Sequence, residues 1–251
     1  MVASFSSAMY LLKAGDDAVS PQLDPHEAAR VLRSTRIFGP LDEPSLLSLA
    51  MASKQRVYGR GQYLWYQGDA GDRLVVISSG MVKVVLTSEQ GDEMVLVTLR
   101  PYETLGELAI LDNSPRSASV VAVERTSVLM LPRSAVLKSM AAHPAVLDAV
   151  LRSLGDLVRR LTKQAGDLVF LDLGGRVAKV LLHLAEGQSS DAEPVALDIR
   201  LSQSDIAAMV GATRPAVNRI LQLLASRGLI VVDGRTILLR DVPALRRRAG
   251  L

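Results

Sequence analysis

The spacing of hydrophobic residues changes from helical to alternating near residue 53. Residues 24–53 have helical spacing, with Pro25 at the start of one predicted helix and Pro44 in the first turn of the next, behind Asp42. Residues 1–23 carry little pattern, and we expect them to form a flexible N-terminal extension.

Residues 54–132 consist of short runs rich in Val, Leu and Ile. Turn pairs separate these runs roughly every ten residues, at Gly68-Asp69, Gly71-Asp72, Ser79-Gly80 and Gly91-Asp92. This pattern predicts an antiparallel sandwich, barrel or roll. One helical turn is predicted to interrupt it near Gly106–Leu111.

Helical periodicity returns after Pro132 and extends to residue 171. Its apolar positions alternate spacings of four and three, and we call them the heptad stripe: Leu147, Leu151, Leu154, Val158, Leu161, Ala165 and Leu168. Such a stripe favours a two-helix dimer seam. The alternative is a single helix packed on its own domain. Gly155 and Gly166 each weaken this helix by about 1 kcal/mol.

The last quarter of the chain predicts a second domain that begins near residue 173. A junction over residues 171–175 precedes a helix at Arg176–Glu186 and a polar loop at Gly187–Pro194. A helix-turn-helix pattern follows at Ser202–Gly228, and after it a hairpin is predicted. We therefore expect four segments: residues 1–23, 24–144, 145–172 and 173–251.

Helix signals divide the helix-turn-helix pattern into two short helices. Ser202 and Asp205 have the spacing of a capping box, and Gly211 suits the sharp turn. Thr213 is a suitable N-cap for the second helix, with Pro215 in its first turn. The buried stripe of that helix is predicted to be Val217, Ile220, Leu221 and Leu224.

The opposite face of the second helix carries residues that can read DNA. Arg214 and Arg219 can each donate two hydrogen bonds to guanine, and Asn218 can pair with adenine in the major groove. The predicted hairpin that follows would form a wing, with Arg235 at its tip facing phosphate. The alternative is a helical hairpin used only for packing.

Composition narrows the class of protein. There is no cysteine, which excludes disulfides and thiolate sites, and the three histidines lack metal-ligand spacing, so we expect no metal. No apolar run reaches the roughly 18 residues of a membrane span, and no signal peptide is apparent. We therefore expect a cytoplasmic protein. Net charge is only +3, but the segment from residue 200 onward contains nine arginines and only three aspartates. This basic segment favours a nucleic-acid partner.

A second set of functional residues lies at Gly106–Ala118, with the sequence GELAILDNSPRSA. The glycine lets backbone N–H groups approach a ligand, and a helix start offers more of them to an anion. Arg116 can bind a phosphate bidentately, Ser117 can add a hydroxyl, and Glu107 can accept a hydrogen bond from a ribose hydroxyl. In isolation, Glu107 and Arg116 would more often form a surface ion pair.

This segment resembles the phosphate-binding cassette of cyclic-nucleotide-binding domains. Over roughly residues 30–245, the chain resembles the cyclic-AMP receptor / fumarate-nitrate regulator superfamily of bacterial transcription factors. It implies an α+β chain with an N-terminal antiparallel β-roll, a long central dimerisation helix and a C-terminal winged helix-turn-helix. It also implies a homodimer, a double-stranded DNA operator and RNA polymerase as a further partner.

The resemblance assigns a role to each matching residue. Glu107 would bind the ribose 2′-hydroxyl, and Arg116 and Ser117 the cyclic phosphate. Backbone contacts would come from Gly106, Leu108 and Ala109, and an apolar base pocket from Val84 and Leu96. The base-reading residues would be Arg214 and Arg219, with Gln203 and Thr213 on phosphates.

Two departures from the family pattern bear on specificity. Leu161 stands where cyclic-AMP-binding members place a threonine for the adenine amine, and Thr162 follows where they have a serine. Pro215 replaces a glutamate that reads cytosine, so the operator need not share the known consensus. The effector is predicted to be cyclic AMP, with cyclic di-GMP or regulation without a nucleotide as alternatives.

Two other classes of function were weighed. An enzyme is not expected, because no metal cluster, nucleophile elbow or phosphate-transfer loop is present. A ligand-binding protein whose C-terminal domain binds another protein is the second alternative. DNA affinity that falls steeply with salt would argue against it.

Overall fold

The computed structural model describes residues 23–185, 195–198, 202–233 and 236–251, and for 195–198 the backbone alone. The predicted N-terminal extension up to residue 22, the loop at 187–194 and Arg235 lie outside the described residues. No helix in the described part is long and apolar enough to cross a membrane.

Two antiparallel sheets form the N-terminal β-roll. One has the order β1-β8-β3-β6, and the other β2-β7-β4-β5. Their strands are β1 (Lys54–Tyr58), β2 (Tyr63–Trp65), β3 (Arg73–Ser79), β4 (Val82–Thr87), β5 (Glu93–Leu99), β6 (Thr104–Leu105), β7 (Ser119–Ala122) and β8 (Thr126–Pro132). The predicted helical turn is α3 (Glu107–Asp112). The fold class expected from the sequence is confirmed.

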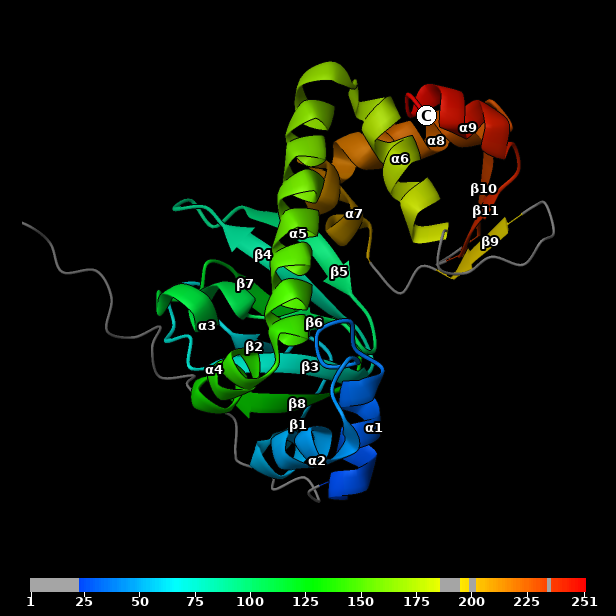
Figure 1. Cartoon of the computed structure of the whole chain (residues 1–251). Coiled ribbons are helices and arrows are strands. Elements are labelled where there is room, and N and C mark those ends of the chain that lie inside the picture. Colours follow the sequence, from blue (N-terminus) through cyan, green and yellow to red (C-terminus); the bar gives the residue numbers. More distant parts are fainter. Residues whose placement is uncertain (1–22, 186–194, 199–201, 234–235) are drawn as a thin grey trace, which may run out of the picture.

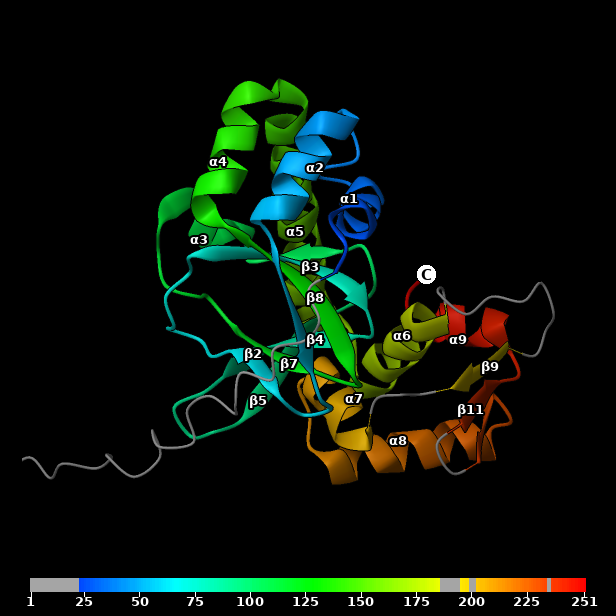
Figure 2. The same ribbon diagram turned by 90° about the horizontal axis from the view of Figure 1, so that it is seen from below.

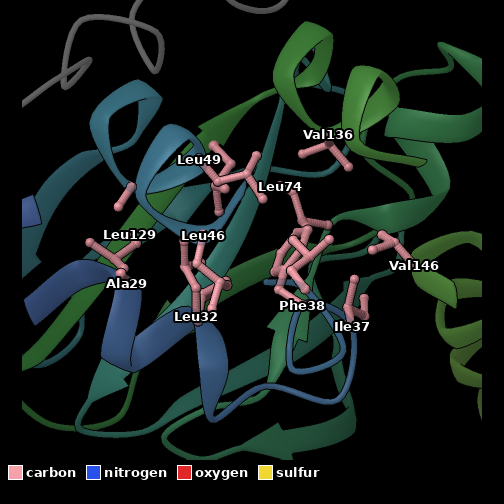
Figure 3. Packing of buried hydrophobic residues seen from close by; sticks show 14 of the residues in the cluster. Ala29, Leu32, Ile37, Phe38, Leu46, Leu49, Leu74, Leu129, Val136 and Val146 are labelled. Carbon is pink, nitrogen blue, oxygen red and sulfur yellow. The ribbon is translucent and has the colours of Figure 1, made fainter. Parts of the chain in front are cut away.

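Alternation along β3 and β8 places apolar side chains on both faces of their sheet. Val75, Ile77 and Val128 pack between the two sheets. Leu74, Leu129 and their neighbours face outward and are covered by α1 (Pro25–Arg33), α2 (Glu43–Ala52) and α4 (Arg133–Ala142). Figure 3 shows this second layer closing around Phe38 and Leu46, which are fully buried. This packing fixes the β-roll as a rigid support for the cassette that follows β6.

The helical stretch after Pro132 is divided rather than continuous. Helix α4 ends before His143, and α5 (Pro144–Phe170) begins directly after it. His143 has φ −129° and ψ 95°, the extended backbone that a following proline favours. Helix α5 then runs past the β-roll to the C-terminal unit (Figure 1).

The C-terminal unit combines helices with a small sheet. Its elements are α6 (Leu173–Ala185), β9 (Val195–Asp198), α7 (Gln203–Val210), α8 (Arg214–Ser226), β10 (Ile230–Asp233), β11 (Thr236–Leu239) and α9 (Val242–Arg248). The predicted hairpin pairs Asp233 with Thr236, and β9 adds a third strand beside β11. Neither β9 nor α9 was predicted from the sequence.

The expected junction over residues 171–175 is shorter in the structure, and this part of the prediction was wrong. Helix α6 already begins at Leu173, because Asp172 caps it through a 2.7 Å hydrogen bond from Gly175 N. Its glycines admit α9: a Cβ at Gly174 would lie 2.6 Å from the Arg248 guanidinium. Arg248 also pairs with Asp172 at 2.7 Å, so this arginine of the basic segment has a structural role.

Candidate ligand cavity and DNA-reading surface

A cavity of about 440 Å³ lies between the β-roll and α5. Nine of the ten residues predicted to bind ligand line it: Val84, Leu96, Gly106, Glu107, Leu108, Ala109, Arg116, Ser117 and Leu161. The tenth, Thr162, does not. Its hydroxyl donates to Val158 O at 2.9 Å, one turn back on α5.

Arg116 places a buried positive charge in the cavity. Its side chain donates to the carbonyls of Arg73 at 2.6 Å and Gly106 at 3.3 Å, while its Nε is buried without a partner. The guanidinium carbon lies 4.0 Å from the centre of the Trp65 ring, in cation–π distance. Burial lowers the pKa of Arg116, whereas the negative charges of Asp72, Asp69 and Glu107 raise it.

No described carboxylate forms a direct ion pair with Arg116. A buried guanidinium that has only carbonyl acceptors can gain strong, charge-assisted hydrogen bonds from an anion. The chemistry of this guanidinium is therefore compatible with a phosphate-like group.

Glycines let the cassette approach Arg116 closely. Gly106 has φ +92°, and a Cβ there would lie 2.3 Å from Arg116 Nη1. Gly71, which was predicted as part of a turn, serves a different purpose: a Cβ there would lie 2.1 Å from the Ala109 Cβ. These contacts hold the start of α3 against the strand that carries Arg73.

Glu107 is the acidic group of the cavity. Ser153 Oγ on α5 donates to its Oε1 at 3.4 Å. Burial raises the pKa of Glu107, although the hydrogen bonds that it accepts and the charges of Arg116 and Arg160 act in the opposite direction. Its carboxyl group thus lies where a hydroxyl of a bound ligand can donate to it.

The rest of the cavity wall has an apolar part and a polar part. Val84, Leu96 and Leu161 line it from β4, β5 and α5. Arg36 and Asp156, which form a 2.9 Å ion pair, also line it. This shape suits a ligand with a flat apolar part and an anionic end.

The helix-turn-helix is formed by α7 and α8. Ser202 and Asp205 form both hydrogen bonds of the predicted capping box, and Gly211 ends α7 with φ +63°. Thr213 stands at the N-cap of α8, but its side chain makes no capping hydrogen bond. Val217, Leu221 and Leu224 are buried as predicted, whereas Ile220 is half-buried.

The outer face of α8 is available to a partner. Thr213, Arg214, Asn218 and Arg219 are exposed, whereas Gln203 at the start of α7 is half-buried. In the described part of the chain, neither Arg214 nor Arg219 has an ion-pair partner.

The first helix of the motif is docked on the β-roll. Lys83 Nζ on β4 lies 2.6 Å from Asp205 Oδ1, and both side chains are largely buried. Burial alone would raise the pKa of Asp205, but hydrogen bonds from Lys83 and Ser202 leave it below the usual value. Met209 packs beside this pair on a small cluster that includes Val85 and Val95. Figure 2 shows α7 against the β-roll and α8 on the outside.

Sequence reasoning missed several residues that shape the cavity. Trp65, Arg73 and Ser153 come from β2, β3 and α5, distant in sequence from the cassette. No local motif marks them. Their role follows only from the way that the sheets and α5 enclose the cassette.

The comparisons with known proteins agree with this geometry. Residues 55–143 match the cyclic nucleotide-binding domain model, and residues 175–248 match the Crp-like helix-turn-helix domain model. The "CRP-like cAMP-activated global transcriptional regulator" of Mycobacterium tuberculosis is 36% identical over 211 residues, covering 82% of this chain and 93% of the relative. The chain belongs to the CRP family of bacterial transcription regulators.

Two solved structures share the fold. A CRP-family transcriptional regulator from Thermus thermophilus is 25% identical with a TM-score of 0.66, covering 78% of this chain and 97% of that one. The c-di-GMP responsive regulator CLP from Xanthomonas campestris is 22% identical with a TM-score of 0.71, covering 80% and 100%. This CRP-family regulator therefore combines a cyclic-nucleotide-binding domain with a DNA-binding helix-turn-helix.

Proposed function

We propose that this regulator acts as a homodimer whose effector is 3′,5′-cyclic AMP, bound in the cavity between the β-roll and α5. The buried Arg116 guanidinium carries the proposal, because its described partners are backbone carbonyls alone and it lines the cavity together with Glu107. The cyclic phosphate would occupy Arg116 and Ser117, and the ribose 2′-hydroxyl would donate to Glu107. Val84, Leu96 and Leu161 would contact the base.

Cyclic AMP is preferred over cyclic di-GMP for two reasons. The Mycobacterium tuberculosis relative at 36% identity is named as cAMP-activated. The cavity also contains a single buried arginine beside one acidic residue of α3, which suits one cyclic phosphate on one ribose.

The exposed stripe of α5 supports the proposed dimer. Leu147, Leu151, Val158, Leu161 and Leu168 are exposed in the single chain, although they are large and apolar. A contiguous apolar face of this kind normally meets a partner, and a heptad repeat fits a second copy of the same helix. In such a dimer, Thr162 would lie near the α5 helix of the second copy.

The exposed face of α8 would read the operator. Arg214, Asn218 and Arg219 would contact base edges in the major groove. Gln203 and Thr213 would contact phosphates, as would Arg235 on the wing. RNA polymerase as a partner stays a prediction.

Calorimetric titration of the full chain tests the effector. We expect saturable binding of cyclic AMP, one molecule per chain, and no saturable heat with cyclic di-GMP. Arg116→Gln should weaken binding by about a hundredfold, since a buried charge-assisted interaction is lost. Arg60→Gln, at an exposed arginine outside the cavity, is the matched control.

Two results would overturn the proposal. Binding of cyclic di-GMP without binding of cyclic AMP would contradict the proposed effector. Unchanged affinity in folded Arg116→Gln protein would contradict the assignment of Arg116 to the phosphate.

A further inference from the structure

A second, larger cavity lies between the β-roll and the C-terminal unit. Its volume is about 630 Å³, and β5, α5, α6 and α7 contribute its walls. These four elements can be followed in Figure 1, where β5, α7 and α6 all lie to the right of α5. This cavity adjoins the cyclic-nucleotide site, whereas the DNA-reading face of α8 lies elsewhere.

The lining of this second cavity is strongly basic. Six lysines and arginines contribute to it, against two acidic side chains, Glu103 and Asp167, and the C-terminal residue Leu251: Arg100, Arg159, Arg160, Lys163, Arg176 and Lys179. Two of these cations already have a carboxylate partner, Lys179 in Asp167 at 2.5 Å and Arg159 in Asp156 at 2.6 Å. Arg100 and Lys163 have no carboxylate partner among the residues that the structure describes.

Buried polar atoms of the lining also lack partners. Arg176 donates through Nη1 to Leu171 O at 3.2 Å, but its Nε is buried with no acceptor. A buried donor without an acceptor costs free energy, so the described acceptors of the chain leave the Arg176 guanidinium incompletely hydrogen-bonded. Gln164 likewise has a buried Oε1 without a donor.

We infer that this cavity binds a small molecule carrying a chain of phosphates, either inorganic or as part of a nucleoside polyphosphate. Cations from α5, from α6 and from Arg100, directly after β5, surround a space larger than one phosphate needs. Guanidinium and ammonium groups together bind several phosphate oxygens. The ligand would neutralise positive charges on both sides of the cavity. It would thereby hold the β-roll and the C-terminal unit together.

The two cavities share a wall. Leu96, Glu103 and Arg160 line both of them. Gln164 Nε2 on α5 donates to Leu96 O at 2.6 Å within that wall. A ligand in the second cavity would therefore contact β5 and α5, as the cyclic nucleotide would. If each ligand changes the affinity for the other, the two effects must be equal.

Calorimetry on the full chain tests the inference with two probes, sodium tripolyphosphate and ATP without metal. Each is titrated at constant ionic strength set with sodium chloride. Each titration is repeated in Arg116→Gln protein, where the cyclic-nucleotide site is disabled. We expect saturable binding of at least one probe, unchanged by Arg116→Gln, whichever effector the first cavity takes. Binding of tripolyphosphate alone assigns an inorganic ligand, and binding of ATP alone assigns a nucleotide.

Paired substitutions locate the binding. Arg100→Gln with Lys163→Gln should weaken it by about tenfold, because two charged contacts are lost. Lys54→Gln with Lys138→Gln removes the same charge from exposed residues outside both cavities and should change nothing. Lys163→Gln alone, at an exposed helix position, serves if the double variant unfolds.

Three results would overturn the inference. One is the absence of saturable heat with either probe. The second is loss of all binding in Arg116→Gln protein, and the third is equal weakening by the two charge-matched pairs.

Discussion

At the scale of single residues, the cavity depends on how closely a few atoms approach Arg116. The resemblance of the cassette, with its spacing of Glu107 and Arg116, predicted nine residues that line the cavity. It could not predict Trp65 beneath the guanidinium, or Ser153 beside Glu107, because these contacts join segments far apart in the sequence. Thr162 was predicted near the base from its sequence position, yet in its own chain it bonds back to its helix.

Gly106→Ala should weaken nucleotide binding by about tenfold or more, because its Cβ would displace the Arg116 guanidinium. Positive φ alone costs an alanine about 1 kcal/mol. Gly61→Ala is the matched control, since Gly61 has φ +80° and nothing within 4 Å of its Cβ. Both variants should lose the stability that a positive φ costs an alanine, and Gly106→Ala should lose more in urea, because only its Cβ meets other atoms. Calorimetry should separate them, and equal nucleotide affinities would contradict this reading of Gly106.

At the scale of elements, sequence signals predicted helices better than short edge strands. The capping box at Ser202 and the left-handed Gly211 were readable from residue types alone. The strand β9 was missed because its four residues have a partner only in β11. Helix α9 was missed although Asp241 caps it by accepting from Ala244 N at 2.8 Å. The three arginines in its last turn, Arg246–Arg248, were interpreted only as part of a basic segment.

Lys83→Met should loosen the docking of α7 on the β-roll. The substitution keeps an apolar stem but removes the ammonium that pairs with Asp205, so a largely buried carboxylate loses a partner. The expected loss is about 1–3 kcal/mol. Hydrogen exchange across α7 should accelerate, whereas Lys54→Met, on exposed β1, should leave it unchanged. Equal protection of α7 in both variants would show that apolar contacts suffice.

At the scale of the whole molecule, the order of the parts could be predicted but their contact could not. The change from alternating to heptad and then helix-turn-helix patterns gave the sequence of β-roll, central helix and DNA-reading unit. The pairing of Lys83 with Asp205, and the burial of Val123 from the β-roll in the C-terminal core, depend on three-dimensional fit. No periodicity in either segment specifies such a contact.

Leu151→Glu with Val158→Glu should convert the proposed dimer to monomers. These side chains are 56% and 62% exposed in the single chain, so the charges harm only an assembly that covers them. Sedimentation velocity measures the change. Met51→Glu, at a position 65% exposed on α2, should leave the dimer intact. A wild-type chain that sediments as a monomer would remove the proposed seam.

Leu161 belongs both to the exposed stripe of α5 and to the wall of the nucleotide cavity. Whatever covers the stripe therefore also completes the cavity. Binding of the nucleotide and pairing of the helices then become linked equilibria, in which each strengthens the other. The cellular concentration of the regulator itself would set how much nucleotide is needed, so a cell that makes more of this protein would respond to a weaker signal.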